Sequence, residues 1–347
     1  MKAFVSFFLV LFLVVVSAKE YDGVDDDDEQ SFPENSITTF RDIPDYSGFE
    51  DDLTFSYYHK SCPDAEAIIQ RKVDEWIKKD DTLAPSLIRL QYHDCVVRGC
   101  DASILLDYEG SERNANQSKS LRGFEVIDDI KAELEKKCPK TVSCSDILVG
   151  AVRDAVRIVG GPFYMVPYGR KDGRVSNAKE AESLPTGREK VTDLVEFFQS
   201  IGLNILDLVV LSGAHTIGRT TCGSVQERLY NFNGTVGRSD PSIDPKYLNF
   251  LKRKCRWASE FVDFDGITPK NFNNEYYKNL QKNMGLLSTD QMLNRDSRTS
   301  VLVSALASQP EVFTSQFAAS MVKLGKIQDP SSEGNGEIRL NCNYINA

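Results

Sequence analysis

Histidine is scarce in this sequence, which has His59, His93 and His215 and no others in 347 residues. So few imidazoles confine any histidine-based chemistry to a small set of positions. The sequence also has no Cys-x-x-Cys pair, so nothing favours a structural zinc site of that type. Beyond the N-terminus it lacks any uninterrupted apolar stretch long enough for a transmembrane helix, and it lacks a long basic patch for nucleic acid.

The N-terminus has the features of a secretory signal. Lys2 precedes a mostly apolar run over residues 3–16, which is short for a bilayer span, and small residues follow up to Ala18. We expect a signal peptide at residues 1–18 and export, with the cell wall favoured over the vacuole. A membrane anchor is the alternative interpretation; after signal cleavage we expect no membrane association.

Acidic charge is concentrated in residues 19–52. This stretch carries 13 acidic side chains against Lys19 and Arg41, whereas the whole chain has a net charge of −10. The remainder, residues 53–347, is therefore close to neutral. We expect a disordered extension or propeptide at residues 19–52 and one globular domain at residues 53–347.

Helical periodicity dominates the globular part. Apolar residues recur with the 3.6-residue period in three stripes, and two of the stripes end at Gly202 and at Gly160-Gly161-Pro162. The eight cysteines all follow the signal, and an even number in an exported chain favours disulfides, although spacing alone leaves roughly a hundred pairings open. Asn116 and Asn233 begin glycosylation sequons. The sequence therefore predicts a mainly α fold with long loops held by disulfides.

His93 has the richest surroundings of the three histidines. Arg89 precedes it by four residues, so on a helix the two side chains share one face, as a base and a charge stabiliser for a reacting oxygen would. The alternative is a buried histidine beside a surface arginine. Asp94, Asp101 and Ser103 follow with hard oxygen ligands of the kind that Ca²⁺ prefers, and the loop at residues 97–99 offers carbonyls.

His215 follows an apolar run and lies between two glycines. An apolar helix that ends in this way could present an imidazole to a haem iron. Asp290, farther along the chain, could accept a hydrogen bond from the other ring nitrogen, as metal-bound histidines require. His59, in contrast, has no chemical partners nearby, and we expect it to be structural.

Taken together, these motifs resemble the secretory plant haem peroxidases, also called class III. The resemblance runs from about Leu53 to Cys342. Five motifs in order carry it: residues 89–103, 121–128, 142–148, 169–174 and 211–216. It implies the plant-type peroxidase fold, with haem b between distal and proximal helical halves and with four disulfides. It also implies an enzyme that reduces hydrogen peroxide and oxidises small phenolic donors in one-electron steps.

The resemblance assigns roles by position. His93 is the distal base and Arg89 stabilises charge on the departing oxygen, while His215 is the axial haem ligand and Asp290 is its hydrogen-bond partner. It further implies two Ca²⁺ ions, a substrate-channel proline and four disulfides. The distal ion takes Asp94, Val97, Gly99, Asp101 and Ser103; the proximal ion takes Thr216, Asp265, Thr268, Asn271 and Asn273; the proline is Pro185; the pairs are Cys62–Cys138, Cys95–Cys100, Cys144–Cys342 and Cys222–Cys255.

Several positions depart from the family pattern. Tyr92 stands where phenylalanine is usual, and Asn273 replaces an aspartate of the proximal calcium set. The chain is one residue short before the second motif, so the asparagine that usually accepts a hydrogen bond from the distal histidine has two candidates, Asn116 and Gln117. The glutamate upstream of that asparagine matches Glu112.

Two other functional classes remain as alternatives. One is a secreted calcium- and haem-binding protein with little turnover, which would have no need of both Arg89 and His93. The other is a catalase-like enzyme, which the apparent axial histidine disfavours because that class uses tyrosine. Nothing in the sequence demands more than a monomer.

Overall fold

The computed structural model describes residues 53–328 and 336–347. The predicted signal peptide and acidic extension lie outside the described residues. Within the described part, helices dominate, and β structure consists of one two-stranded sheet and isolated bridges. The prediction of a mainly α domain is confirmed.

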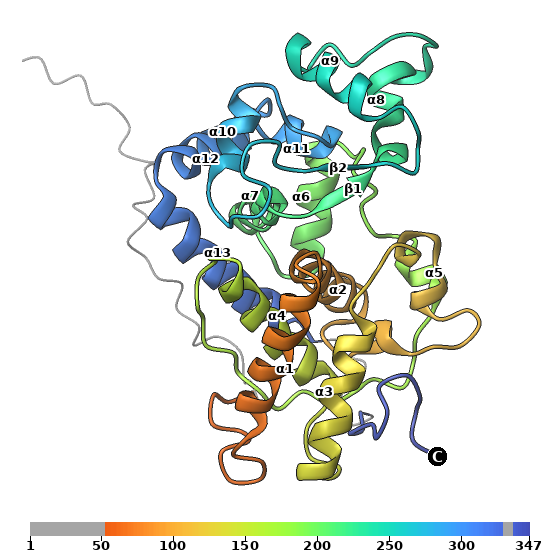
Figure 1. Ribbon diagram of the computed structural model, residues 1–347, viewed down its shortest axis with the longest axis vertical. Helices are drawn as coiled ribbons and strands as arrows, with labels where there is room; N and C mark the ends of the chain where they lie inside the picture. The colour runs from red at the N-terminus through yellow and green to blue at the C-terminus, as the bar shows by residue number, and fades with distance from the viewer. Residues whose placement is uncertain (1–52, 329–335) are drawn as a thin grey trace, which may run out of the picture. The chain divides into compact units, whose positions relative to one another are not determined.

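Figure 1 shows the course of the chain through its regular elements, some of which are joined by long loops, such as that between Ile158 and Ala178. The α-helices are α1 (Ala65–Lys79), α2 (Leu83–Arg98), α3 (Phe124–Lys137), α4 (Cys144–Ile158), α5 (Ala178–Ala181), α6 (Val191–Ser200), α7 (Ile205–Ser212), α8 (Gln226–Tyr230), α9 (Pro245–Lys254), α10 (Glu275–Gln281), α11 (Ser288–Leu293), α12 (Ser297–Ser308) and α13 (Pro310–Gly325). The 3-10 helices are η1 (Ser103–Leu105), η2 (Glu112–Asn114), η3 (Asn116–Ser118), η4 (Gly213–Thr216), η5 (Cys222–Val225) and η6 (Phe232–Gly234). The strands are β1 (Arg219–Thr221) and β2 (Phe261–Asp263).

The three apolar stripes of the sequence form the buried faces of α1, α4 and α6. Ser143 caps the start of α4, and its hydroxyl accepts a hydrogen bond from the backbone N–H of Asp146 at 3.1 Å. It ends just before Gly160, which has a φ of +88° that L side chains rarely adopt. Helix α6 ends before Gly202 for the same reason. Periodicity and glycine stops therefore located these helices correctly.

The helices form two groups that share one large hydrophobic core. Helices α1 to α4 pack together in the first group, whereas α6, α7 and α10 to α12 belong to the second (Figure 1). Helix α13 contacts both α2 and α7, so it joins the two groups. A separate small core lies beneath α8 and α9. The arrangement places α2, which carries Arg89 and His93, in one group and α7, which leads to His215, in the other.

The small sheet fixes the segment that follows His215. Strand β1 begins three residues after Thr216 and pairs antiparallel with β2, in a register that sets Arg219 opposite Asp263. Strand β2 leads directly into Phe264 and Asp265. The pairing thus draws two segments that are distant in sequence to the same place.

All four predicted disulfides are present, and the described residues contain no free cysteine. Cys144–Cys342 ties the start of α4 to the C-terminal segment, with a sequence separation of 198 residues. The pair Cys95–Cys100 closes a short loop at the end of α2. The others are Cys62–Cys138 and Cys222–Cys255.

The motif at residues 169–174 has a structural role. Arg170 is buried and pairs with the buried carboxylate of Asp146 at 2.7 Å. The next carboxylate, Asp172, accepts hydrogen bonds from the backbone N–H groups of Ser145 and Arg339, each at 2.9 Å. These bonds join α4, the loop after it and the C-terminal segment, and they support the loop that contains Asp101.

In the part of the chain that the structure describes, no single helix has the length and apolar composition to cross a membrane. Only the bent pair Val191–Ser200 and Ile205–Thr216, with an angle of 109° between them, meets the length and composition criteria together. Both helices of the pair bury apolar residues in the core.

Candidate active site

Helix α2 presents Arg89 and His93 one turn apart. The side chain of His93 is buried, with 6% of its surface exposed. Arg89 is more exposed, and its guanidinium is held by two hydrogen bonds, to the Ser120 hydroxyl at 2.9 Å and to the backbone carbonyl of Gln117 at 3.0 Å. The i, i+4 spacing predicted from the sequence therefore puts a fixed cation beside an imidazole.

Burial and the charge of Arg89 keep His93 neutral. Burial is the larger cause and the nearby guanidinium the second, and together they lower the pKa of His93 to about 3. A neutral imidazole retains a free lone pair at physiological pH, which a proton acceptor must have. The ring of Tyr92 meets that of His93 edge-on with centroids 6.2 Å apart, and burial raises the pKa of the Tyr92 hydroxyl.

Neither amide predicted as the acceptor beside His93 bonds to it in the structure, although Gln117 keeps a buried Oε1 without a partner. Nδ1 of His93 is buried without a hydrogen-bond partner. Asn116 is exposed, and its side-chain oxygen accepts a hydrogen bond from Lys119 at 2.6 Å. Gln117 instead uses its amide nitrogen to reach the carbonyl of Glu182 at 3.4 Å. Asn116 is therefore excluded as the partner of His93 by its exposure, and Gln117 makes no bond to it.

A third polar group in the same stretch escaped the sequence analysis. The hydroxyl of Ser118 is buried and also lacks a partner. Ser118 was not considered as a candidate, because the family pattern has an amide side chain in this stretch and Ser118 has none. Only its burial marks it as distinct from the exposed serine at position 120.

Three carboxylates lie near the end of α2: Asp94 in the helix and Glu112 in η2 are buried, and Asp101 in the loop between them is partly buried. The carboxylate of Asp94 accepts the backbone N–H of Ala102 at 3.1 Å, and that of Asp101 accepts the N–H of Ser103 at 2.9 Å. The hydroxyl of Ser103 and both carboxylate oxygens of Glu112 are buried without partners. Such unpartnered oxygens are costly unless a ligand engages them.

The carboxylates in this loop resist ionisation because they are buried close together. Burial is the first cause at each, and it raises the pKa of Asp101 to about 6 and that of Glu112 to about 8, with the negative charge of Asp101 adding to the shift at Glu112. The pKa of Asp94 is also raised, by burial and then by Asp101 and Glu112. A divalent cation would offset this repulsion.

Val97 and Gly99 complete the predicted distal set. Val97 lies in the last turn of α2, and Gly99 caps the helix with a φ of +80°, which a residue with a side chain rarely adopts. Pro185 lies half-buried in the loop between α5 and α6. Within the described residues no group of three or more His, Cys, Asp or Glu side chains forms a metal site, so an ion in this loop would depend on hydroxyl and carbonyl oxygens as well.

His215 lies in η4, directly after α7. Its Nδ1 is 2.8 Å from Oδ1 of Asp290, which leaves Nε2 as the free ring nitrogen. The imidazole stacks on Phe264, with ring centroids 4.0 Å apart and 9° between the planes. A Cβ on Gly213 would come within 2.3 Å of the Tyr277 hydroxyl, so only glycine permits this close packing before His215.

Asp290 is placed by the start of α11. It is buried, and its Oδ2 accepts the backbone N–H of Leu287 at 3.0 Å. Burial acts to raise the pKa of Asp290, but His215 and the hydrogen bonds from Leu287 and Tyr276 lower it overall. The carboxylate is therefore ionised and fixes Nδ1–H as the protonated tautomer of His215.

The sequence analysis did not identify Tyr276. Its hydroxyl donates to the same Asp290 oxygen at 3.0 Å, and its ring packs edge-on against the His215 ring at 6.2 Å. Tyr276 lies in a mostly polar stretch and next to a second tyrosine, so no signal in the sequence set it apart.

The residues of the predicted proximal set are linked to one another by hydrogen bonds. The hydroxyl of Thr216 lies 3.4 Å from the Asn271 carbonyl and 3.3 Å from Oδ1 of Asn273. The hydroxyl of Thr268 donates to Asp265 at 2.7 Å and accepts from the Asn273 amide at 3.0 Å. Asp265 is the sole carboxylate in this predicted set.

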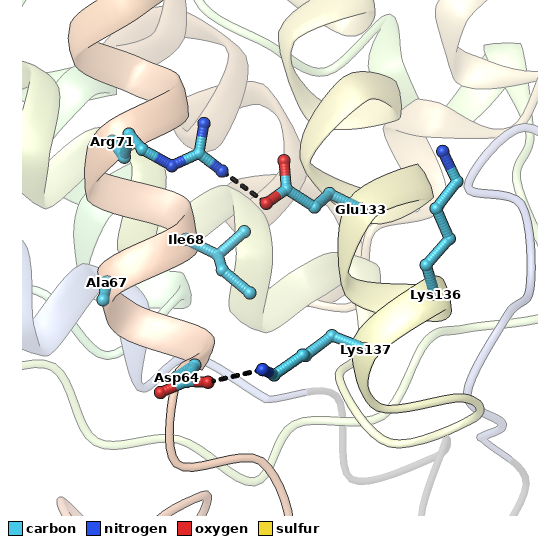
Figure 2. A pocket seen from close by; sticks show the side chains of 7 residues that line it. All are labelled: Asp64, Ala67, Ile68, Arg71, Glu133, Lys136 and Lys137. Atoms are coloured by element: carbon cyan, nitrogen blue, oxygen red, sulfur yellow. Dashed lines mark hydrogen bonds and ion pairs between the residues drawn. The ribbon is translucent and has the colours of Figure 1, made fainter.

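A surface groove between α1 and α3 carries charge of both signs, and both of its acidic side chains are paired with bases. Figure 2 shows Arg71 pointing toward Glu133 and Asp64 toward Lys137, the latter pair at 3.0 Å. The groove contains none of the predicted site residues. Its lining is Asp64, Ala67, Ile68, Arg71, Glu133, Lys136 and Lys137.

Comparisons with known proteins agree with one another. The family model described as peroxidase matches residues 69–309. Peroxidase 7 of Arabidopsis thaliana is 54% identical over 330 residues, which cover 94% of this chain and 90% of that protein. Peroxidase 28 of Arabidopsis thaliana is 44% identical, over 85% of this chain and 93% of its own length. Peroxidase 5 of Vitis vinifera is 43% identical, over 86% and 93% respectively.

The coverage of the first of these relatives bears on the N-terminal stretch. A match over 94% of 347 residues is too long to lie within residues 53–347 alone. It therefore extends into residues 1–52, whereas an 85% match fits within the globular part.

Proposed function

Because this chain belongs to the peroxidase family, and within it to the secretory plant haem peroxidases that reduce hydrogen peroxide, we propose that His93, Arg89 and His215 carry that reaction. The observation that chiefly supports these roles is the state of His93, a buried neutral imidazole one helical turn from a fixed guanidinium. Base and cation are the two groups that heterolysis of a peroxide bond requires.

The residues present fit a haem, which we propose to be haem b. His215 keeps Nε2 free, because Asp290 occupies Nδ1, and so it has the correct tautomer to coordinate iron. No hydrogen bond or ring contact joins His93 and His215 in the described structure, and they belong to different helix groups. His215 is the residue that would hold such a haem, and the haem would supply the electrons for cleavage of the O–O bond.

His93 then transfers the proton, and Arg89 stabilises the developing charge. Neutral His93 accepts a proton from one peroxide oxygen and delivers it to the other, which leaves as water. The guanidinium of Arg89 stabilises the negative charge that develops on the leaving oxygen. The two hydrogen bonds to Ser120 and Gln117 hold this cation in position, so little reorganisation is needed during the step.

Small phenolic compounds are the proposed electron donors, with Pro185 at the edge of their access channel. We further propose a monomer that is exported to the cell wall. The run of apolar residues at positions 3–16 and the pairing of all eight cysteines support export. Asn116 and Asn233 are exposed, as glycosylated asparagines must be.

The activity and the acid–base role can be tested together. Purified protein reconstituted with haem is expected to show a Soret band and to oxidise a phenolic dye when peroxide is added. Because protonation of His93 removes the base, and its pKa is about 3, the rate with peroxide should change little between about pH 5 and 8 and should fall as pH approaches 3. If the protein bound haem but did not oxidise the dye, the result would instead support the alternative of a calcium- and haem-binding protein with little turnover.

Two Ca²⁺ ions are proposed, one in each predicted set. The distal set has two carboxylates, Asp94 and Asp101, with Glu112 close by, whereas the proximal set has only Asp265. Affinity rises with ligand charge, so a chelator titration followed by metal analysis should remove the proximal ion first. The substitution Asn273→Asp should bring the Ca²⁺ affinity of the proximal site closer to that of the distal site. Equal retention of both ions by the unmodified protein would contradict this expectation.

A further inference from the structure

The carboxylate of Asp290 is shared between two side chains. Oδ1 lies 2.8 Å from Nδ1 of His215 and accepts the Tyr276 hydroxyl at 3.0 Å. Oδ2 is occupied by the backbone N–H of Leu287 at 3.0 Å. The proposed axial histidine therefore competes with a phenol for one oxygen atom.

The competing hydroxyl is held in place by burial. Tyr276 is 3% exposed and Asp290 is 2% exposed, so water does not offer either group an easy alternative partner. The Tyr276 ring also contacts the His215 ring and the ring of Tyr277, which restricts its rotation. A hydrogen bond between a phenol and a carboxylate in such surroundings is strong, because one partner is charged.

When one oxygen accepts two hydrogen bonds, each of the two bonds is weaker than it would be alone. Each hydrogen bond to Oδ1 draws electron density from that oxygen, so the oxygen pulls less on the Nδ1 proton of His215. The less this proton is drawn toward Asp290, the less electron density reaches Nε2, and the weaker the donation to a bound iron.

We propose that Tyr276 is a positioning residue that limits the electron donation of His215 by occupying Oδ1 of Asp290. The inference rests on the proposed role of His215 as axial ligand. Tyr276 would touch neither haem nor peroxide and would act only through Asp290. Its function would be to set the reduction potential of the iron and to keep the carboxylate oriented toward Nδ1.

Tyr276→Phe removes the hydroxyl and keeps the ring. In the haem-loaded protein, Oδ1 would then accept from His215 alone, and His215 would donate more strongly to the iron. Stronger donation stabilises the ferric state, so the ferric-to-ferrous equilibrium constant should fall about tenfold, which for a one-electron couple is about 59 mV toward negative potential. The iron–histidine stretching frequency of the ferrous protein should rise in resonance Raman spectra.

Tyr277→Phe is a matched control. Tyr277 is the next residue and is equally buried, but its hydroxyl donates to the backbone carbonyl of Val209 at 3.1 Å and not to a carboxylate. Loss of that hydroxyl should leave both the potential and the stretching frequency at their parental values. If Tyr276→Phe and Tyr277→Phe gave the same values, Tyr276 would be merely a packing residue and the proposal would be overturned.

A second variant at position 276 tests the proposal even if Tyr276→Phe does not fold correctly. Site-specific 3,5-difluorotyrosine at position 276 keeps the shape and provides a more acidic, stronger donor. It should shift the potential and the stretching frequency in the directions opposite to those of Tyr276→Phe. A shift in the same direction, or none, would overturn the proposal.

Failure of the proposed function would look different. If His215 were not the axial ligand, the parent protein would show no iron–histidine stretching band at all. If only the inference about Tyr276 were wrong, the parent and all variants would show the same band at the same frequency. The two failures are therefore separable in one set of spectra.

Discussion

Replacement of His93 with alanine is expected to slow the reaction with hydrogen peroxide by about 10²- to 10⁴-fold, which is the usual contribution of a positioned acid–base group. The imidazole is the neutral base proposed to act beside Arg89, and alanine removes this proton acceptor. Haem should still bind, because His215 and Asp290 are on the other helix group. Stopped-flow measurement of the haem absorbance after mixing with peroxide gives the rate.

His59→Ala provides the control for this experiment. His59 is exposed and precedes α1, and no chemistry is assigned to it. Its replacement should leave the peroxide reaction unchanged. A His93→Ala protein that reacted as fast as the parent would remove His93 from the mechanism. If His93→Ala also lost its Soret band, the substitution would have disturbed the haem site more widely.

Removal of the Cys144–Cys342 disulfide is expected to cause the largest loss of stability among the four bridges. The bridge closes a loop of about 200 residues, and chain-entropy reasoning gives about 5 kcal/mol for a loop of that length. Both half-cystines are buried, so the double alanine variant also leaves a cavity at the start of α4. Denaturant unfolding of the oxidised proteins measures the change in free energy.

The Cys95–Cys100 bridge serves as the comparison. It closes a loop with a sequence separation of 5, for which the same reasoning gives about 2 kcal/mol. Its removal should instead loosen the segment between Asp94 and Asp101, and so weaken retention of the proposed distal ion. If both double variants lost the same free energy of unfolding, loop length would not be the controlling factor.

Asn273 of the proposed proximal calcium set differs from the family pattern, and the structure shows what this side chain contacts. Asn273 was recognised in the sequence as a departure from an aspartate, and the structure shows its amide bonded to Thr268. Oδ1 of Asn273, the atom that would face a cation, already accepts the backbone N–H of Glu275 at 2.8 Å, whereas the carboxylate of Glu112 has no partner. The structure therefore supplies a reason, beyond the charge, for the weaker affinity expected here.

The sequence by itself determined the local elements, and its resemblance to a known family supplied the proposed site residues. The 3.6-residue stripes and the glycine stops located α1, α4 and α6, because both depend on neighbours along the chain. The spacing of Arg89 and His93 determined their shared helix face for the same reason. The resemblance to a known family supplied the disulfide pairs, which cysteine spacing alone left open, and the structure confirmed them.

Tertiary structure alone decided which groups meet across long sequence separations. The exposure of Asn116 and the burial of Ser118 depend on how the loop before α3 packs, and a one-residue gap does not reveal that. Tyr276 reads as an ordinary core residue until the fold brings its hydroxyl to Asp290, 14 residues away, and brings Asp290 to His215, 75 residues away. Hydrogen bonds of this kind depend on side-chain direction to within an ångström, and only the packed structure sets that direction.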